Sequence, residues 1–313
     1  MPGRSPYVPQ SVLSHVKVYF ALSRTPHGLL DMATPAVAAL LWYGSFPPLP
    51  VALLGLMTAF AGYTAVYALN DLVDYRVDRA KLMQGGFRDT KDYLDAVLVR
   101  HPMAYGLLTF REALVWALVW ALVAVTGAYL LNPACVVIFI AACLLEAVYC
   151  LMWRTSYLRT LVSGAVKTSG GMAAVFAVDP NPSLSFLVLL FLWLFFWEIG
   201  GQNIPADWTD VEEDRSFKAT TIPVRFGPRW SAAIVLCSLI LALALNVVLL
   251  VFSPAGVHIV HITASLAAGV YLLLIPAIRL YRSRGRAEAA YLFNMASYYP
   301  VALLGFSVMR LAS

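Results

Sequence analysis

The chain has 313 residues, of which 61% are hydrophobic and 12% are charged, and its formal net charge is +5. Soluble domains contain about 25% charged residues, so this chain has too few charges to cover a surface that faces water, and a soluble globular enzyme is excluded. Disorder is excluded as well, because it requires low hydrophobicity. The class that remains is a polytopic helical membrane protein.

Nine apolar stretches are long enough to cross a bilayer, which takes about 20 mostly apolar residues. In chain order they are residues 27–46, 50–70, 113–131, 133–153, 160–178, 184–205, 230–252, 257–278 and 289–309. Their apolar runs are continuous and do not alternate, which excludes a β-barrel. We predict a single all-α domain, residues 1–313, with nine transmembrane helices.

The basic residues fix the expected orientation. Of the 22 Lys and Arg residues, 21 lie in the N-terminal segment or near alternate connections, and Arg310 is the exception. By the positive-inside rule the N-terminus is cytoplasmic and the C-terminus is outside, and 71–112 and 206–229 become cytoplasmic cap loops. A polar stretch over 88–102 is expected to form a cap helix. The positive charge thus lies on one membrane face and indicates no nucleic-acid partner. We expect an integral membrane protein of the bacterial inner membrane.

Two acidic clusters with the same spacing follow the second and the sixth predicted spans. The first consists of Asp71, Asp74 and Asp78, preceded by Asn70, and the second consists of Asp207, Asp210 and Asp214. If helices continue through them, each i, i+3, i+7 set shares one helical face. Like charges so close together destabilise a helix, so both clusters require a compensating cation. Carboxylate oxygens suit Mg²⁺, which typically bridges carboxylates to substrate phosphates.

Basic residues are interleaved with these acids. They include Arg76 after the first cluster and Arg215 and Lys218 after the second. A face that offers both carboxylates and cationic side chains suits a diphosphate bridged by metal ions. Alone, any one of these bases is explained by the positive-inside rule.

At this point the sequence resembles the UbiA superfamily of intramembrane prenyltransferases. The motifs N-D-x-x-D-x-x-x-D at 70–78 and D-x-x-D-x-x-x-D at 207–214 match, as do Arg24-Thr25-Pro26-His27 before the first span and Thr221-Ile222-Pro223-Val224 after the second motif. The resemblance implies a helical bundle around a central cavity, with two Mg²⁺ ions and a polyprenyl diphosphate held between the motifs at the cytoplasmic side of the bilayer. The family's R-P-L-x-x-G segment is absent, and Gln202-Asn203 and Lys218 depart from its pattern.

These matches assign roles to particular residues. Asp71, Asp74, Asp78, Asp207, Asp210 and Asp214 are expected to hold the metal, with Asp71, Asp74, Asp207 and Asp210 as the catalytic set. Asn70, Arg76, Arg215 and Lys218 are expected to contact the diphosphate, and Tyr67 and Tyr149 to face the prenyl cation. Ionisable residues within spans default to functional hypotheses, and here they are Asp31, Glu146, Lys167 and Glu198.

The leading prediction is Mg²⁺-dependent transfer of a prenyl group from a polyprenyl diphosphate to a small, aromatic or quinone-precursor acceptor in quinone-type or related lipid biosynthesis. Two enzyme alternatives keep this site: a terpene cyclase, and a transferase that uses a sugar phosphate as acceptor. A transporter is the remote alternative, since its acids would line a path at mid-membrane.

Overall fold

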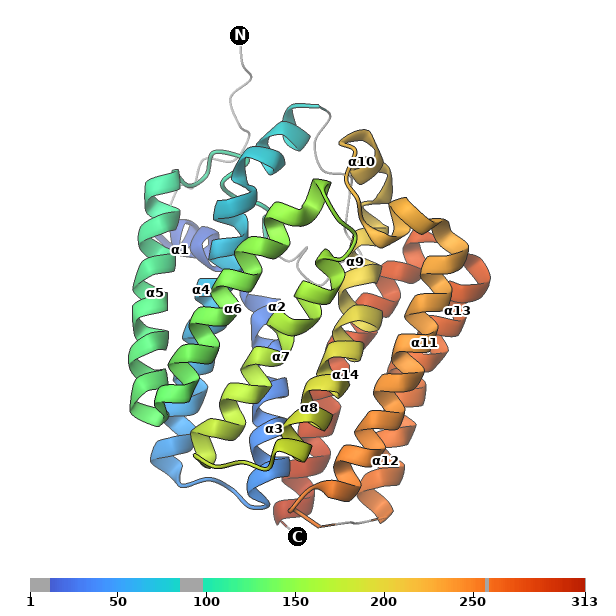
Figure 1. Cartoon of the computed structure of the whole chain (residues 1–313). Coiled ribbons are helices and arrows are strands. Elements are labelled where there is room, and N and C mark those ends of the chain that lie inside the picture. The colour runs from blue at the N-terminus through green and yellow to red at the C-terminus, as the bar shows by residue number, and fades with distance from the viewer. Residues whose placement is uncertain (1–11, 85–97, 257–258, 313) are drawn as a thin grey trace.

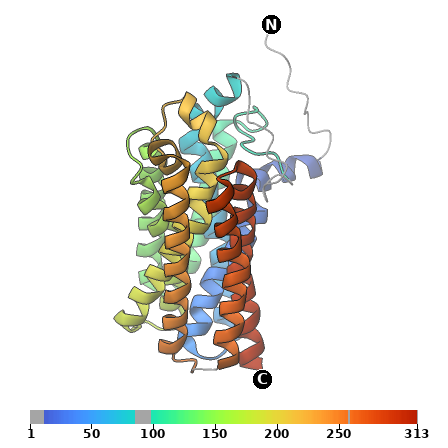
Figure 2. The ribbon, with the colours of Figure 1, turned by 90° about the vertical axis from the view of Figure 1, so that its right-hand side faces the viewer.

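The computed structural model describes residues 12–84, 98–256 and 259–312. Every regular element in these ranges is helical, and the long helices form an upright bundle (Figures 1 and 2). Eight helical segments in the described ranges are long and apolar enough to cross a membrane: Leu49–Met83, Phe110–Leu131, Pro133–Arg154, Arg159–Val178, Leu184–Thr209, Ile222–Phe252, Ile259–Ser283 and Arg286–Ala312. The all-α membrane class is thereby confirmed, and eight of the nine predicted spans correspond to one of these segments.

The remaining predicted span, 27–46, is divided into two short helices, α2 (Thr25–Asp31) and α3 (Ala33–Tyr43). Pro35 has no N–H group with which to bond the carbonyl of Asp31 four residues earlier. The hydroxyl of Thr34 donates to that carbonyl instead, at 2.8 Å. A preceding helix, α1 (Val12–Leu22), runs across the direction of the bundle near its upper end (Figure 2).

Helix α4 (Leu49–Met83) is the element that positions the first acidic cluster. It has 35 residues, which at 1.5 Å per residue makes it about 52 Å long, well beyond the roughly 30 Å of a hydrocarbon core. The predicted cap loop 71–112 therefore begins later than expected, because the helix continues through the motif to Met83. Residues 85–97 of the expected cap helix lie outside the described residues, and 98–109 form turns and bends without a regular helix.

Three long helices follow α4: α5 (Phe110–Leu131), α6 (Pro133–Leu151) and α7 (Arg159–Val178). A capping box starts α5: Thr109 and Glu112 satisfy each other's backbone N–H groups. A short 3₁₀ turn, η2 (Met152–Arg154), ends α6. In space α5 packs against α4, and α7 packs against both α6 and α3.

The sixth predicted span is interrupted inside the bundle. Helix α8 (Leu184–Trp197) passes into a π-helical segment, η3 (Glu198–Asn203), and then into α9 (Ile204–Thr209) and α10 (Val211–Ser216). Gly200 lies in η3, where an added Cβ would be 2.9 Å from side-chain atoms of Leu239 and Ser238. The π segment thus packs directly against the next long helix, and π segments are frequent at functional sites.

The remaining helices close the second half of the bundle. Helix α11 (Ile222–Phe252) bends at Gly227, whose φ of 73° and ψ of 174° are accessible mainly to glycine, and Pro228 follows. Helix α12 (Ile259–Gly269) continues through η4 (Val270–Leu274) into α13 (Ile275–Ser283), and α14 (Arg286–Ala312) ends at the lower end of the bundle in Figure 1. Trp193, Trp197 and Tyr299 are fully buried in the core between α8 and α14.

Candidate active site

The first acidic cluster lies on one face of α4, as its spacing predicted. Asn70, Asp71 and Asp78 are buried, and Asp74 is half-buried. Arg24, the residue just before α2, reaches this face: its guanidinium donates to Oδ1 of Asn70 at 3.2 Å and lies 3.4 Å from Oδ1 of Asp71. The cluster therefore receives positive charge from a segment 47 residues earlier in the chain.

The second acidic cluster lies at a helix break. Asp207 is in α9, Asp214 is in α10, and Asp210 joins the two with a non-helical φ of −106° and ψ of 11°. The predicted continuous helical face is thus wrong for this cluster, although all three carboxylates remain at the same end of the bundle. Each has a cationic partner: Arg159 at 3.8 Å from Asp207, Arg100 at 2.8 Å from Asp210, and Lys81 at 3.5 Å from Asp214.

These contacts bring the two clusters together. Lys81 follows Asp78 by three residues on α4 and pairs with Asp214 of the second cluster. The adjacent residues Arg100 and His101 contact different clusters. Arg100 pairs with Asp210 of the second cluster, and His101 contacts the first cluster. The two clusters, which are 136 residues apart in the sequence, therefore lie together, and five of their six aspartates line the cavity described below, while Asp71 does not.

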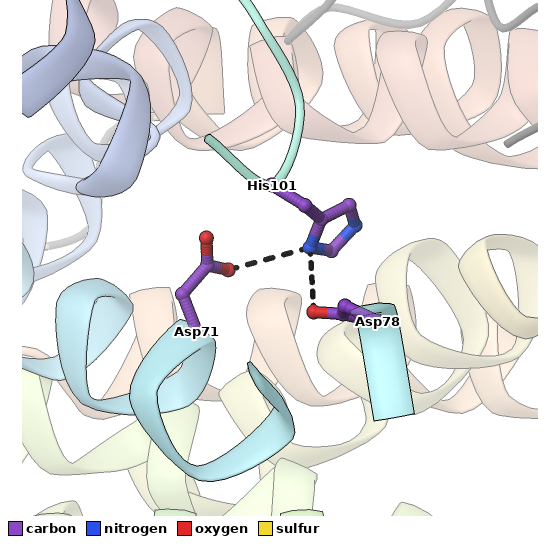
Figure 3. Close-up of side chains that lie close together, drawn as sticks. All are labelled: Asp71, Asp78 and His101. Atoms are coloured by element: carbon purple, nitrogen blue, oxygen red, sulfur yellow. Dashed lines mark ion pairs between the residues drawn. The ribbon is translucent and has the colours of Figure 1, made fainter. Parts of the chain in front are cut away.

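His101 is a site residue that the sequence analysis did not assign. Its Nδ1 lies 2.8 Å from Oδ2 of Asp78 and 3.5 Å from Oδ1 of Asp71, as Figure 3 shows. The three side chains are buried, and their potential ligand atoms lie within 4.8 Å of one another. Burial disfavours the charged imidazolium, but the two carboxylates outweigh burial and raise the pKa of His101 above its ordinary value. In the sequence, the signal for His101 as a site residue is its position in a polar stretch between two predicted spans.

Charge also sets the state of the second cluster. Burial opposes ionisation of Asp210, but the guanidinium of Arg100 outweighs that effect and lowers the pKa of this carboxyl. Burial raises the pKa of Asp214, with Lys81 acting in the opposite direction. Two neighbouring carboxyl groups therefore differ in their affinity for protons according to how closely a base approaches each of them.

The basic residues predicted for the diphosphate lie elsewhere. Arg76, Arg215 and Lys218 are exposed and do not line the cavity described below. Arg76 is two residues beyond Asp74, which places it on a different face of α4. In the part of the chain that the structure describes, the Lys and Arg side chains that line the cavity near the aspartates are Arg24, Lys81, Arg100 and Arg159.

A cavity of about 620 Å³ extends from the aspartates into the bundle. Asn70, Asp74, Asp78, Asp207, Asp210 and Asp214 line one end of it. Most of its remaining wall is apolar and comes from α3 to α7, including Leu40, Phe46, Val51, Leu56, Phe139 and Val178. Such a space suits a molecule with an anionic head and a long hydrocarbon tail.

The two predicted aromatic residues both line this cavity. Tyr67 lies one helical turn before Asp71 and hydrogen-bonds to Asp31. The hydroxyl of Tyr149 accepts a hydrogen bond from the side-chain amide of Asn203 at 2.9 Å, and the guanidinium of Arg159 lies 4.0 Å from the centre of the Tyr149 ring. Tyr149 is therefore fixed next to the second cluster.

The residues present fit divalent cations. All six aspartates offer hard oxygen ligands, which Mg²⁺ prefers, and Oδ2 of Asp207 is buried without a hydrogen-bond partner in the described part of the chain. A buried unpaired carboxylate oxygen is costly, and a bound cation would satisfy it.

The fold and this site define an integral membrane protein with acidic side chains at one end of a largely apolar cavity. The chain matches the model of the UbiA prenyltransferase family over residues 32–298. The chain belongs to this family, and it is therefore an enzyme of the prenyltransferase class. No curated protein sequence matches it significantly.

Solved structures show the same fold. An apo UbiA homolog from Aeropyrum pernix K1 aligns with a TM-score of 0.73 and 21% identity over 90% of this chain and 97% of that chain. A UbiA homolog from Archaeoglobus fulgidus bound to DMAPP and Mg²⁺ aligns with a TM-score of 0.68 and 16% identity over 94% and 99%. The same homolog bound to GPP and Mg²⁺ aligns with a TM-score of 0.68 and 16% identity over 95% and 100%.

Proposed function

We propose that this protein transfers a prenyl group from a polyprenyl diphosphate to a small acceptor in quinone-type or related lipid biosynthesis. The observation that carries the proposal is the shared cavity: two aspartate clusters from distant parts of the chain line one end of it, and the rest of its wall is mostly apolar. The Archaeoglobus fulgidus homolog bound to DMAPP or GPP with Mg²⁺ supports the same class of donor.

The two clusters would hold two Mg²⁺ ions, with Asp71, Asp74 and Asp78 on one side and Asp207, Asp210 and Asp214 on the other. When bound, Mg²⁺ supplies positive charge that stabilises the departing diphosphate. The catalytic set of the proposal is Asp71, Asp74, Asp207 and Asp210. His101 lies between the carboxylates of Asp71 and Asp78 and holds both of them in place.

The chain's own cations bind the remaining charge of the diphosphate. Arg24, Lys81, Arg100 and Arg159 line the same end of the cavity, and guanidinium groups bind phosphate oxygens in pairs. Asn70 accepts a hydrogen bond from Arg24 and so helps to position that guanidinium beside α4. We leave Arg76, Arg215 and Lys218 out of this contact set because they are exposed and do not line the cavity.

The prenyl chain occupies the apolar part of the cavity, where water is excluded and a carbocation survives long enough to react. Tyr67 and Tyr149 present aromatic surfaces near the aspartates, and such surfaces attract cations. The basic residues near alternate connections support an active site that faces the cytoplasm. Our proposal also includes a bacterial inner membrane as the location and the whole chain as one domain.

Purified protein with Mg²⁺, geranyl diphosphate and a mixture of phenolic acceptors tests the proposal, with products measured by mass spectrometry. We expect a prenylated acceptor, no product in EDTA, and losses of about 100-fold or more in Asp71→Asn and Asp207→Asn. Glu288→Gln, at the start of α14 and outside the cavity lining, is the matched control.

Two results would contradict the proposal: full activity of both aspartate variants, or full activity of the wild-type protein in EDTA. A cyclic hydrocarbon formed without any acceptor would favour the cyclase alternative. Solute flux in proteoliposomes without any prenyl product would favour transport.

A further inference from the structure

A second group of ionisable side chains lies deeper in the same cavity. The ammonium Nζ of Lys167 is 2.5 Å from Oδ2 of Asp31 and 3.4 Å from the hydroxyl of Tyr67. His27 approaches the other oxygen of Asp31 at 3.7 Å. The charges of Lys167 and Asp31 therefore compensate each other, and neither is needed by the metal site.

Glu198 also lies on the cavity wall, where it feels the charge of Lys167 but has no ion pair of its own among the described residues. It is the first residue of η3 and is only 6% exposed. Its Oε1 accepts a hydrogen bond from the hydroxyl of Ser163 at 2.8 Å, whereas its Oε2 is buried without a hydrogen-bond partner in the described ranges. Glu146, the other glutamate on this wall, accepts a hydrogen bond from Asn70 at 2.6 Å. Glu198 thus has a buried carboxylate oxygen that no hydrogen bond from the described residues satisfies, whereas the bond from Asn70 reaches Oε1 of Glu146.

Helix α7 shows where this oxygen lies relative to the reaction. Arg159, Ser163 and Lys167 stand at i, i+4 and i+8, so they follow one another along one face of the helix. Arg159 contacts Asp207 at the end of the cavity that the aspartates line. Ser163 contacts Glu198, and Lys167 contacts Asp31. One helical turn, about 6 Å, separates Ser163 from Arg159. The contact between Ser163 and Glu198 therefore lies one turn of α7 away from the contact between Arg159 and Asp207.

The local charge indicates what kind of acceptor fits. Asp31, Glu146 and Glu198 contribute three acidic side chains to this part of the molecule, against the ammonium of Lys167 and the imidazole of His27 beside Asp31. Arg24 and Arg159 are close by, but they pair with aspartates of the two clusters. A carboxylate on the acceptor would be repelled here, whereas a neutral hydroxyl group could donate a hydrogen bond to Oε2 of Glu198.

We propose that Glu198 accepts the proton that the acceptor loses during prenyl transfer, and that this acceptor is a neutral molecule with a hydroxyl group directed at Glu198. The inference rests on the proposed function. The C–O bond of the prenyl diphosphate breaks, and its electron pair leaves with the diphosphate. The prenyl carbon replaces one hydrogen of the acceptor, and that hydrogen leaves as a proton to Oε2 of Glu198.

The test uses the purified full chain with Mg²⁺ and geranyl diphosphate, offered either hydroquinone or 4-hydroxybenzoate. We expect hydroquinone to be prenylated at least tenfold faster. Glu198→Gln should lower this transfer by about 100-fold or more, while the folded variant still binds geranyl diphosphate with Mg²⁺ as tightly as the wild-type protein does. Glu288→Gln should behave as wild type. If Glu198→Gln fails to fold, Ser163→Ala, which removes the hydrogen bond to Oε1, should lower transfer by about tenfold.

Three outcomes would overturn the inference: transfer in the folded Glu198→Gln variant within threefold of wild type, faster transfer to 4-hydroxybenzoate, or no product from hydroquinone while geranyl diphosphate is consumed. A wild-type protein that never consumes geranyl diphosphate with Mg²⁺ would contradict the proposed function itself. That result is distinguishable from the three outcomes above, which contradict only the role of Glu198.

Discussion

The buried pair of Asp31 and Lys167 allows a quantitative prediction about stability. Asp31 is 2% exposed, and Lys167 Nζ is 2.5 Å from its Oδ2. Replacing Lys167 by Met keeps the apolar length of the side chain but removes the ammonium. Among the described residues, the carboxyl of Asp31 then keeps the Tyr67 hydroxyl and His27 as polar neighbours. Breaking a buried pair by removing one partner costs about 3–5 kcal/mol.

The unfolding entropy of a chain of this size converts that loss into a fall of roughly 5–8 °C in Tm. Thermal unfolding of the protein in detergent measures it. In the double variant Asp31→Asn with Lys167→Met, most of the loss should be recovered, because no uncompensated charge stays buried. Lys17→Met, at an exposed position of α1, is the matched control and should change the free energy of unfolding by less than about 0.5 kcal/mol.

The reasoning would be refuted by a Lys167→Met protein as stable as wild type. It would also be refuted by a double variant that is less stable than either single variant, since the two losses would then add as they do for independent sites.

Two further changes test the packing and the first cluster. In Gly164→Ala the new Cβ would lie 2.6 Å from Cδ2 of Phe195, so we expect α7 and α8 to be strained by about 1–3 kcal/mol. Gly305→Ala, which has no atom within 4 Å of its new Cβ, should leave Tm unchanged or raise it; equal Tm values for the two variants would contradict the packing argument. Glu146→Leu removes the acceptor for the amide of Asn70, and kcat/KM for geranyl diphosphate should fall roughly tenfold. Glu146→Gln should retain most of that activity, and an equal loss in both variants would show that this hydrogen bond is not the cause.

The sequence determined the membrane class, eight of the spans and the two acidic clusters, because these features are local. A run of apolar residues excludes water whatever its neighbours are, and i, i+3, i+7 spacing puts Asp71, Asp74 and Asp78 on one face of any helix that includes them. One interruption of the expected helices also has a local cause, because Pro35 lacks the N–H group that would bond the carbonyl of Asp31.

Which cations meet these carboxylates was decided by the tertiary structure. Arg76 and Arg215 are near the aspartates in sequence but face away from the cavity, since a helix turns by about 100° per residue. Arg24 and His101, which do reach Asp71, come from segments that no helical period connects to it. Periodicity specifies the faces of one element, whereas the partner of a face depends on how whole elements pack against one another.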